Sequence, residues 1–166
     1  MSAQPAGRRS RLRSAALVAV VALAASLGLT ALAAAPASAA VPVCHSSVAV
    51  KKTVSGKLRT AQIPSYSGKI TCQMVKGAEG REVKALQTTL KKCYRQYDLN
   101  RNLAVDGEFG PDTKQALKNA QTAVNKEFAA QGSSKRISVD GMYGPESRTF
   151  LRWAFERSPA YSCLRL

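Results

Sequence analysis

The sequence predicts an all-α fold: a compact domain of three helices with short extended segments at two Asp-Gly loops, preceded by a disulfide-closed N-terminal extension. Two observations predict this fold. The segment 105–117, VDGEFGPDTKQAL, recurs later in the chain as 139–151, VDGMYGPESRTFL, so one supersecondary unit is used twice. Residues 79–97 also place apolar side chains at helical spacing.

The first predicted helix spans residues 79–97. Its apolar side chains fall on one face and most of its basic side chains fall elsewhere, as in a helix that packs one side against a core. The apolar face consists of Val83, Leu86, Leu90, Cys93 or Tyr94, and Tyr97.

Each copy of the repeat predicts a tight loop that leads into a helix. In the first copy, Gly107 can adopt left-handed backbone angles, and the Asp106 side chain can accept hydrogen bonds from nearby amides. Phe109 is a large aromatic that would plug the loop into a core. Gly110 and Pro111 predict an N-cap followed by proline at the first helical position. The second copy repeats the pattern with Asp140, Gly141, Tyr143, Gly144 and Pro145.

Three further assignments complete the predicted fold. The third helix is expected to continue through Leu151, Trp153 and Phe155, with one aromatic turned inward and the other exposed. The stretch 122–139, between the second helix start and the second Asp-Gly loop, predicts either that the second helix continues into it or that a loop forms at 131–135. In the extension, residues 57–62 and 69–73 predict two short strands around a Pro-Ser-Tyr-Ser-Gly turn.

The ordered motifs resemble the small three-helix peptidoglycan-binding domain that is commonly attached to bacterial cell-wall hydrolases. The resemblance covers roughly residues 77–156 and departs from the family pattern at Ala120–Gln121, where Phe-Gln is usual. It rests on Gly77, Gly80, Val83, Leu86, Gln87, Leu90, Val105, Asp106, Gly107, Phe109, Gly110, Thr113, Ala116, Asp140, Gly141, Gly144, Pro145 and Ser147. It implies non-catalytic binding of peptidoglycan by a domain over 77–166, preceded by an extension over 40–76.

The same resemblance implies that ligand contacts come from the loops before the second and third helices. Backbone amides at positive helix ends there would suit the carboxylates of a wall peptide. The implied ligand-binding residues are Asp106, Gly107, Phe109, Gly110, Lys114, Asp140, Gly141, Tyr143, Gly144, Arg148 and Trp153.

The N-terminal segment 1–39 predicts a secretory signal peptide. Four arginines precede an apolar, Ala-rich run over 15–35, and Ala37–Ser38–Ala39 is a small-residue cleavage pattern. An uncleaved membrane anchor is the alternative, because the run is near membrane-spanning length. Cleavage would give a secreted, cell-wall-associated protein without stable membrane association, exported by the general route or, as an alternative, the twin-arginine route.

Four cysteines remain in the predicted mature chain, and an even number in an exported protein predicts two disulfides. Three connectivities are open. We favour Cys44–Cys72, which closes the extension onto itself, and Cys93–Cys163, which ties the first helix to the C-terminal region. A metal site is the competing interpretation, but the sequence contains no Cys-x-x-Cys pair.

The charge balance points to anionic partners. The whole chain has 25 basic and ten acidic residues, a net charge of +15. Loss of the four signal-peptide arginines would leave a net charge of +11. Peptidoglycan and anionic wall polymers would attract such a domain, although solubility alone could account for the charge. Nucleic acid is not an expected partner, because the chain has no recognition motif and no stacking array of aromatics.

We expect no enzymatic activity, no cofactor and no metal. His45 is the single histidine, whereas a zinc peptidase needs several His and acidic ligands. Asp106 and Asp140 are the symmetrical pair that a glycosidase could use, but their turn role is the stronger explanation. Two other functions stay open: a secreted protein-interaction or inhibitor module on the same scaffold, and a small cell-wall hydrolase.

Overall fold

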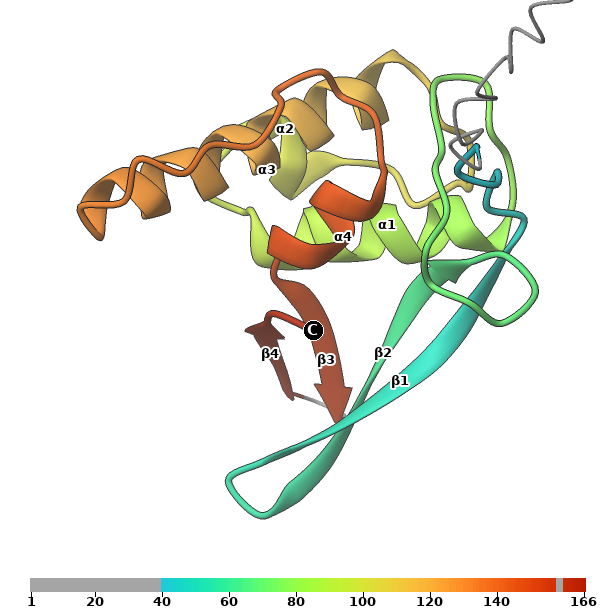
Figure 1. Ribbon diagram of the computed structural model, residues 1–166. Helices are drawn as coiled ribbons and strands as arrows, with labels where there is room; N and C mark the ends of the chain where they lie inside the picture. The colour runs from blue at the N-terminus through green and yellow to red at the C-terminus, as the bar shows by residue number, and fades with distance from the viewer. Residues whose placement is uncertain (1–39, 158–159) are drawn as a thin grey trace, which may run out of the picture. The chain divides into compact units, whose positions relative to one another are not determined.

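Helices and strands together build the fold (Figure 1), and the all-α prediction is wrong. The computed structural model describes residues 40–157 and 160–166, so the predicted signal peptide lies outside the described residues. Four antiparallel strands form one sheet in the order β1-β2-β3-β4. In chain order, the elements are β1 (Ser46–Val54), β2 (Lys57–Ser65), α1 (Arg81–Cys93), α2 (Asp98–Asn102), α3 (Pro111–Ala130), α4 (Pro145–Phe150), β3 (Trp153–Arg157) and β4 (Ala160–Leu164).

A long hairpin in the extension supplies the first two strands. Ser55 and Gly56 join β1 to β2 with φ angles of 50° and 71°, and left-handed angles at both central residues are those of the tightest hairpin turn. The predicted strand 57–62 therefore exists inside β2, but its partner is β1. The predicted strand 69–73 is wrong, because this segment makes only the isolated bridges of Lys69 with Tyr66 and of Gln73 with Val43.

The chain after α4 is extended, which corrects the prediction of a continuing third helix. The backbone leaves the helical region at Leu151, where ψ is 148°, and β3 begins shortly after it. Trp153 and Phe155 lie two positions apart on this strand, so both point to the same face of the sheet, and both are fully buried. Neither aromatic is exposed, because the apolar positions follow the two-residue period of a strand.

The helices after the two Asp-Gly loops begin as the sequence predicts. Gly110 is the N-cap of α3 and Pro111 is its first residue, and Gly144 and Pro145 do the same for α4. The longer second helix is confirmed, since α3 has 20 residues. A largely exposed loop follows it from Gln131 to Arg136. The short helix α2 was not expected.

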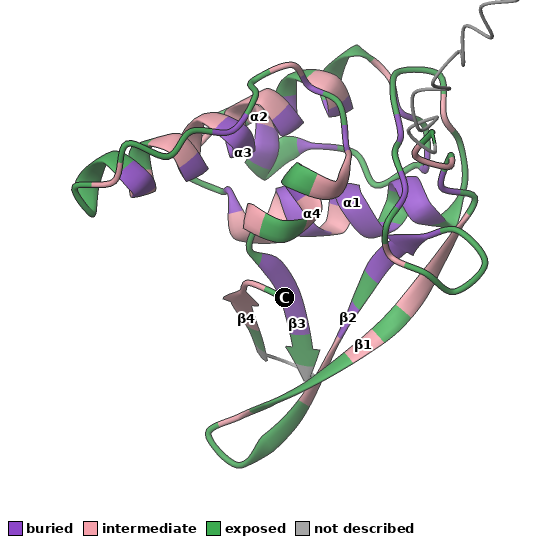
Figure 2. Cartoon of the chain, in the orientation of Figure 1, coloured by how far each residue is buried: buried purple, intermediate pink, exposed green. Residues whose placement is uncertain are grey.

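The repeat is longer than the recurring loop, because it includes the helix before each loop. Residues 80–113 and 114–147 align without a gap, although α2 of the first copy corresponds to loop residues 132–136 of the second. Buried residues lie along both α1 and α3 (Figure 2). Six pairs of corresponding apolar residues are buried in both copies: Val83 and Leu117, Leu86 and Ala120, Leu90 and Val124, Tyr94 and Phe128, Leu103 and Ile137, Phe109 and Tyr143. Thus α1 and most of α3 are equivalent helices.

One apolar core joins the extension to the helices. The extension contributes Cys44, Ala61, Ile63, Cys72 and Met74 to the same cluster as the two repeats and β3. Within this core the ring centroids of Tyr143 and Trp153 lie 6.0 Å apart in an edge-to-face arrangement, which is favourable for aromatic pairs. The sheet and the helices therefore stabilise each other.

Both favoured disulfides are present. Cys44 and Cys72 lie 5.1 Å apart between Cα atoms, and Cys93 at the end of α1 lies 5.6 Å from Cys163 in β4. Within the described residues, no helix is long and apolar enough to span a membrane.

Replacing both Cys93 and Cys163 by Ser should lower the free energy of unfolding by about 4 kcal/mol, because the bond closes a loop of 70 residues. The pair Cys44→Ser and Cys72→Ser should cost about 3.5 kcal/mol, because its loop is 28 residues. Urea unfolding of both variants and of the oxidised protein measures these differences. If the variant with Cys93→Ser and Cys163→Ser is as stable as the oxidised protein, the assigned role of this bond is contradicted.

Candidate functional site

A buried glutamine side chain organises the first Asp-Gly loop. Gln87, on α1, accepts a hydrogen bond at Oε1 from the Gly107 amide at 2.9 Å. Its Nε2 group lies 2.7 Å from Asp106 Oδ1, 3.0 Å from the Glu108 carbonyl oxygen and 3.0 Å from Thr113 Oγ1. We call this set the first clamp. It satisfies the polar atoms of the loop from a single side chain on the preceding helix.

The second Asp-Gly loop has the same arrangement at the corresponding positions. Gln121, on α3, accepts a hydrogen bond at Oε1 from the Gly141 amide at 3.0 Å. Its Nε2 group lies 3.0 Å from Asp140 Oδ1 and 3.2 Å from both the Met142 carbonyl oxygen and Ser147 Oγ. This set is the second clamp. Gln121 thus has a defined structural role. The departure from the usual Phe-Gln pair is confined to the residue before it, Ala120.

The glycines of both loops are required by backbone angle and by space. Gly107 has φ 91° and Gly141 has φ 71°, in the region that favours glycine. A Cβ atom at Gly107 would lie 2.9 Å from the Lys84 side chain, and one at Gly141 would lie 2.9 Å from the Lys114 carbonyl oxygen. Each loop therefore lies directly against the preceding helix.

The carboxylate of Asp106 is held in its charged form by the loop around it. Its Oδ1 accepts a hydrogen bond from the Glu108 amide at 2.9 Å and a second from Gln87. These two bonds, the Glu108 amide first, lower the pKa of Asp106 below its usual range. This aspartate is therefore an exposed, ionised acid at the loop surface.

Three adjoining hollows surround the first loop. The largest encloses about 420 Å³ and the other two about 300 Å³ each, and Glu108 lines all three. The largest also contains Arg81 and Lys84 from the first turns of α1, together with Glu79 and Asp106. The hollows thus present charges of both signs, which suits a ligand that has both carboxylate and amino groups.

Several predicted ligand residues are used inside the fold. The amides of Gly107 and Gly141 already donate to the two clamps, and Phe109, Tyr143 and Trp153 are buried. Trp153 donates its Nε1 hydrogen bond to the Arg148 carbonyl oxygen at 3.1 Å. These residues therefore support the surface from the core side, and their groups are not exposed on it.

The other predicted ligand residues lie at the surface of the two loops. Asp106 is exposed, and Asp140, Lys114, Arg148, Gly110 and Gly144 are half-buried. Lys114 lies with its aliphatic stem against Gly141. Arg148 donates through Nη2 to the Thr149 hydroxyl at 3.1 Å. The structure therefore groups Asp106 with Gly110 around the first loop, and Lys114 with Asp140 near the second.

Four charged residues that line the largest first-loop hollow were not predicted from the sequence as ligand residues: Glu79, Arg81, Lys84 and Glu108. The equal spacing of Gln87 from Asp106 and of Gln121 from Asp140 could have revealed the clamps, because both pairs are separated by 19 residues. No comparable signal marks Arg81 and Lys84, which take part only because the loop returns to the start of α1.

His45 and the cysteines have no close association with this surface. The His45 ring lies edge to face on Tyr66, with ring centroids 4.9 Å apart. All four cysteines are in disulfides. Among the described residues, no group of three or more His, Cys, Asp and Glu side chains could hold a metal ion.

Replacing Gln87 by Leu should lower the free energy of unfolding by about 2 kcal/mol, because the buried Gly107 amide loses its acceptor. Gln121→Leu should cost a similar amount, and the two costs should add because the clamps share no partner. Gln115→Leu is the matched control, since Gln115 is exposed and bonds only Asn119. Chemical denaturation measures all three. Equal stability of Gln87→Leu and the control would refute the clamp.

Replacing Asp106 by Asn should remove a pH-dependent part of the stability. Because the folded pKa of Asp106 is lowered, its stabilising effect is present above the unfolded carboxyl pKa of about 4 and is lost as the pH falls through the folded pKa. Unfolding curves at pH 7 and near pH 2 should therefore show a smaller difference between the protein and Asp106→Asn at the acid pH. A difference that is constant with pH would contradict this prediction.

Comparison with known proteins agrees with the geometry of the two loops. Residues 79–151 match the family described as "Putative peptidoglycan binding domain", and this range contains both clamps and the helices α1 to α4. Comparison with curated proteins and with solved structures gives no significant match. Residues 79–151, somewhat less than half of the chain, are therefore similar to this peptidoglycan-binding family.

Proposed function

We propose that this protein binds bacterial peptidoglycan without cleaving it. The main support is the coincidence of the matched range with the two clamped loops. The clamps hold the loops in fixed positions, and a preorganised surface loses less entropy when it binds a ligand. In this proposal, the four disulfide-bonded cysteines and His45 have structural roles.

The first-loop surface is the proposed contact with the wall peptide. Arg81 and Lys84 lie in the first turns of α1, where the positive end of the helix also favours a carboxylate. Glu79 and Glu108 lie beside them and can accept hydrogen bonds from an amino group. Wall peptides carry both kinds of group, so the mixed charge supports a peptide ligand.

The extension supports a second, less specific attraction to anionic wall polymers. Residues 40–76 contain six basic residues and no acid. Lys51 and Lys57 are exposed on the hairpin, and its turn lies away from the helices (Figure 1). Attraction between such a segment and a polyanion is long-ranged and falls with salt.

A location outside the cytosol follows from the same proposal. Two disulfides are typical of proteins in oxidising compartments, and the proposed ligand is in the cell wall. We therefore propose a secreted, wall-associated protein.

Binding to purified insoluble peptidoglycan tests the function. Changing Arg81 and Lys84 together to Glu should weaken binding roughly tenfold or more, because a charge-assisted contact is lost. The pair Lys114→Glu and Arg148→Glu tests the second loop in the same way. Lys126→Glu, an exposed change on α3, is the control and should bind normally. The fraction of protein that sediments with peptidoglycan is measured for each variant. Only variants whose melting temperature is unchanged are compared.

The same assay separates the alternatives. Binding that survives removal of the anionic polymers and moderate salt supports recognition of peptidoglycan itself. No binding, together with one defined secreted protein partner, would favour an interaction or inhibitor module. Release of dye from labelled wall that is abolished by changing His45 or Asp106 would instead favour a hydrolase.

A further inference from the structure

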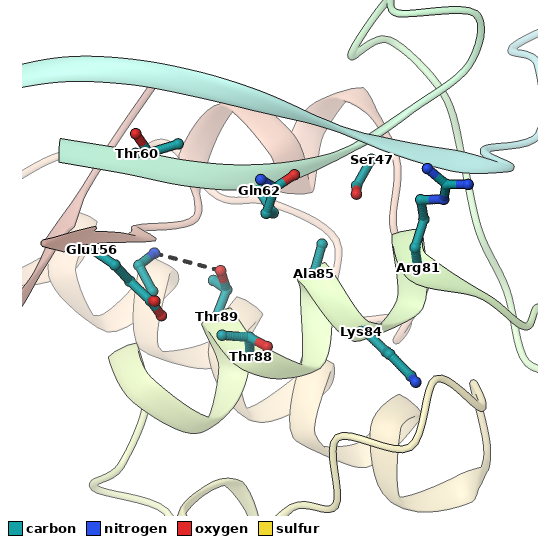
Figure 3. Close-up of a pocket in the computed structure, with 10 residues that line it drawn as sticks. Ser47, Thr60, Gln62, Arg81, Lys84, Ala85, Thr88, Thr89 and Glu156 are labelled. Carbon is teal, nitrogen blue, oxygen red and sulfur yellow. Dashed lines mark hydrogen bonds between the residues drawn. The ribbon is translucent and has the colours of Figure 1, made fainter. Parts of the chain in front are cut away.

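A second groove lies on the sheet side of α1 (Figure 3) and adjoins the largest first-loop hollow, because Arg81 and Lys84 line both. It encloses about 460 Å³, within the range of roughly 300–1,000 Å³ that small-ligand sites occupy. Ser47, Thr60 and Gln62 from the hairpin face Thr88 and Thr89 from α1 across it, and Glu156 of β3 lies at one end. We call this the sheet groove.

The sheet groove exists because the hairpin and β3 lie beside α1. Thr60 and Glu156 are paired residues of β2 and β3, and the Ala154 amide donates to Thr89 Oγ1 at 3.4 Å, which fixes the strand against the helix. Only the α1 side of the groove lies inside residues 79–151. Its other side belongs to segments that the family match does not cover.

The sheet groove is lined by hydrogen-bonding side chains, by Ala85 and Ala154, and by the charged residues Arg81, Lys84 and Glu156. Hydroxyl and amide groups and the two alanines lie between its ends, and no aromatic side chain is among the residues that line the groove. Arg81 lies at the end formed by the start of α1. At the other end, Glu156 pairs with Lys92 through Oε1 only, and Oε2 can accept a further hydrogen bond.

We propose that the sheet groove binds a short peptide with a free carboxylate. The carboxylate lies at Arg81 and the start of α1, the peptide amides bond the hydroxyls and Gln62, and an amino group lies at Glu156. A glycan chain fits less well, since no aromatic face is present for a sugar ring. The inference rests on the proposed function and extends the proposed wall-peptide contact from the first-loop surface into this groove, since Arg81 lines both. It assigns the stem peptide of peptidoglycan, rather than its glycan, to the groove.

Titration calorimetry of the purified protein tests the assignment with two synthetic stem peptides, one with a C-terminal carboxylate and one with a C-terminal amide. The acid should bind roughly tenfold more tightly than the amide, because one charge-assisted contact is lost. Arg81→Gln should weaken binding of the acid by the same factor and leave the amide unchanged. Equal effects of Arg81→Gln on both peptides would overturn the assignment of the carboxylate.

A bulky residue in the groove provides a second test. Thr88→Trp should fill the groove and reduce peptide binding at least roughly tenfold. Thr122→Trp is its matched control, because Thr122 is the corresponding residue of the second repeat, is also half-buried and does not line the groove. Near-equal melting temperatures of the two variants establish that any difference comes from the groove.

The outcomes separate the groove from the proposed function. If Thr88→Trp and Thr122→Trp bind the acid peptide equally, or if peptide-free glycan competes as well as the peptide, the groove assignment fails while wall binding can stand. If the unchanged protein does not sediment with peptidoglycan, the proposed function fails. Selective loss in Thr88→Trp, with discrimination against the amide peptide, supports the groove.

Discussion

The amide of one buried glutamine in each repeat determines how the helical part of the fold is assembled. Both ends of this amide are used: its oxygen satisfies a loop amide and its nitrogen satisfies loop acceptors. Each loop is thereby fixed to the helix before it, and the aromatic that follows, Phe109 or Tyr143, enters the core. A loop without this partner would leave the buried amide of Gly107 or Gly141 unpaired.

The sheet adds buried apolar surface to a helical domain that is small. The two short repeats bury a modest amount of apolar surface, and small domains gain stability from additional covered surface or from crosslinks. The hairpin and β3 supply Ile63, Trp153 and Phe155 to the common core, and the two disulfides fix the extension and the last strand. The extension is thus part of the packed structure, as well as the source of a groove.

The sequence was most informative where a local chemical requirement has only one solution. The Asp-Gly loops and the Gly-Pro helix starts followed from such requirements, and the favoured disulfide pairing was also confirmed. The sheet was not predictable in the same way, because β1 and β2 alternate weakly and are joined by the two-residue turn Ser55–Gly56, whereas the prediction placed the turn at the later Pro-Ser-Tyr-Ser-Gly segment. Trp153 and Phe155 were assigned to a helix although their spacing was that of a strand. The polar groove and the first-loop charges depend on contacts between distant segments, for which a single sequence has no local signal.

The bond between Cys93 and Cys163 has a consequence for resistance to proteolysis. It closes a covalent ring that contains all of α3 and the exposed 131–136 loop. Exposed loop tips of this kind are preferred sites of nicking. A single cut there leaves both fragments linked, and the buried contacts of the two halves stay in register. The protein can therefore be cleaved once in this loop without separating into two fragments.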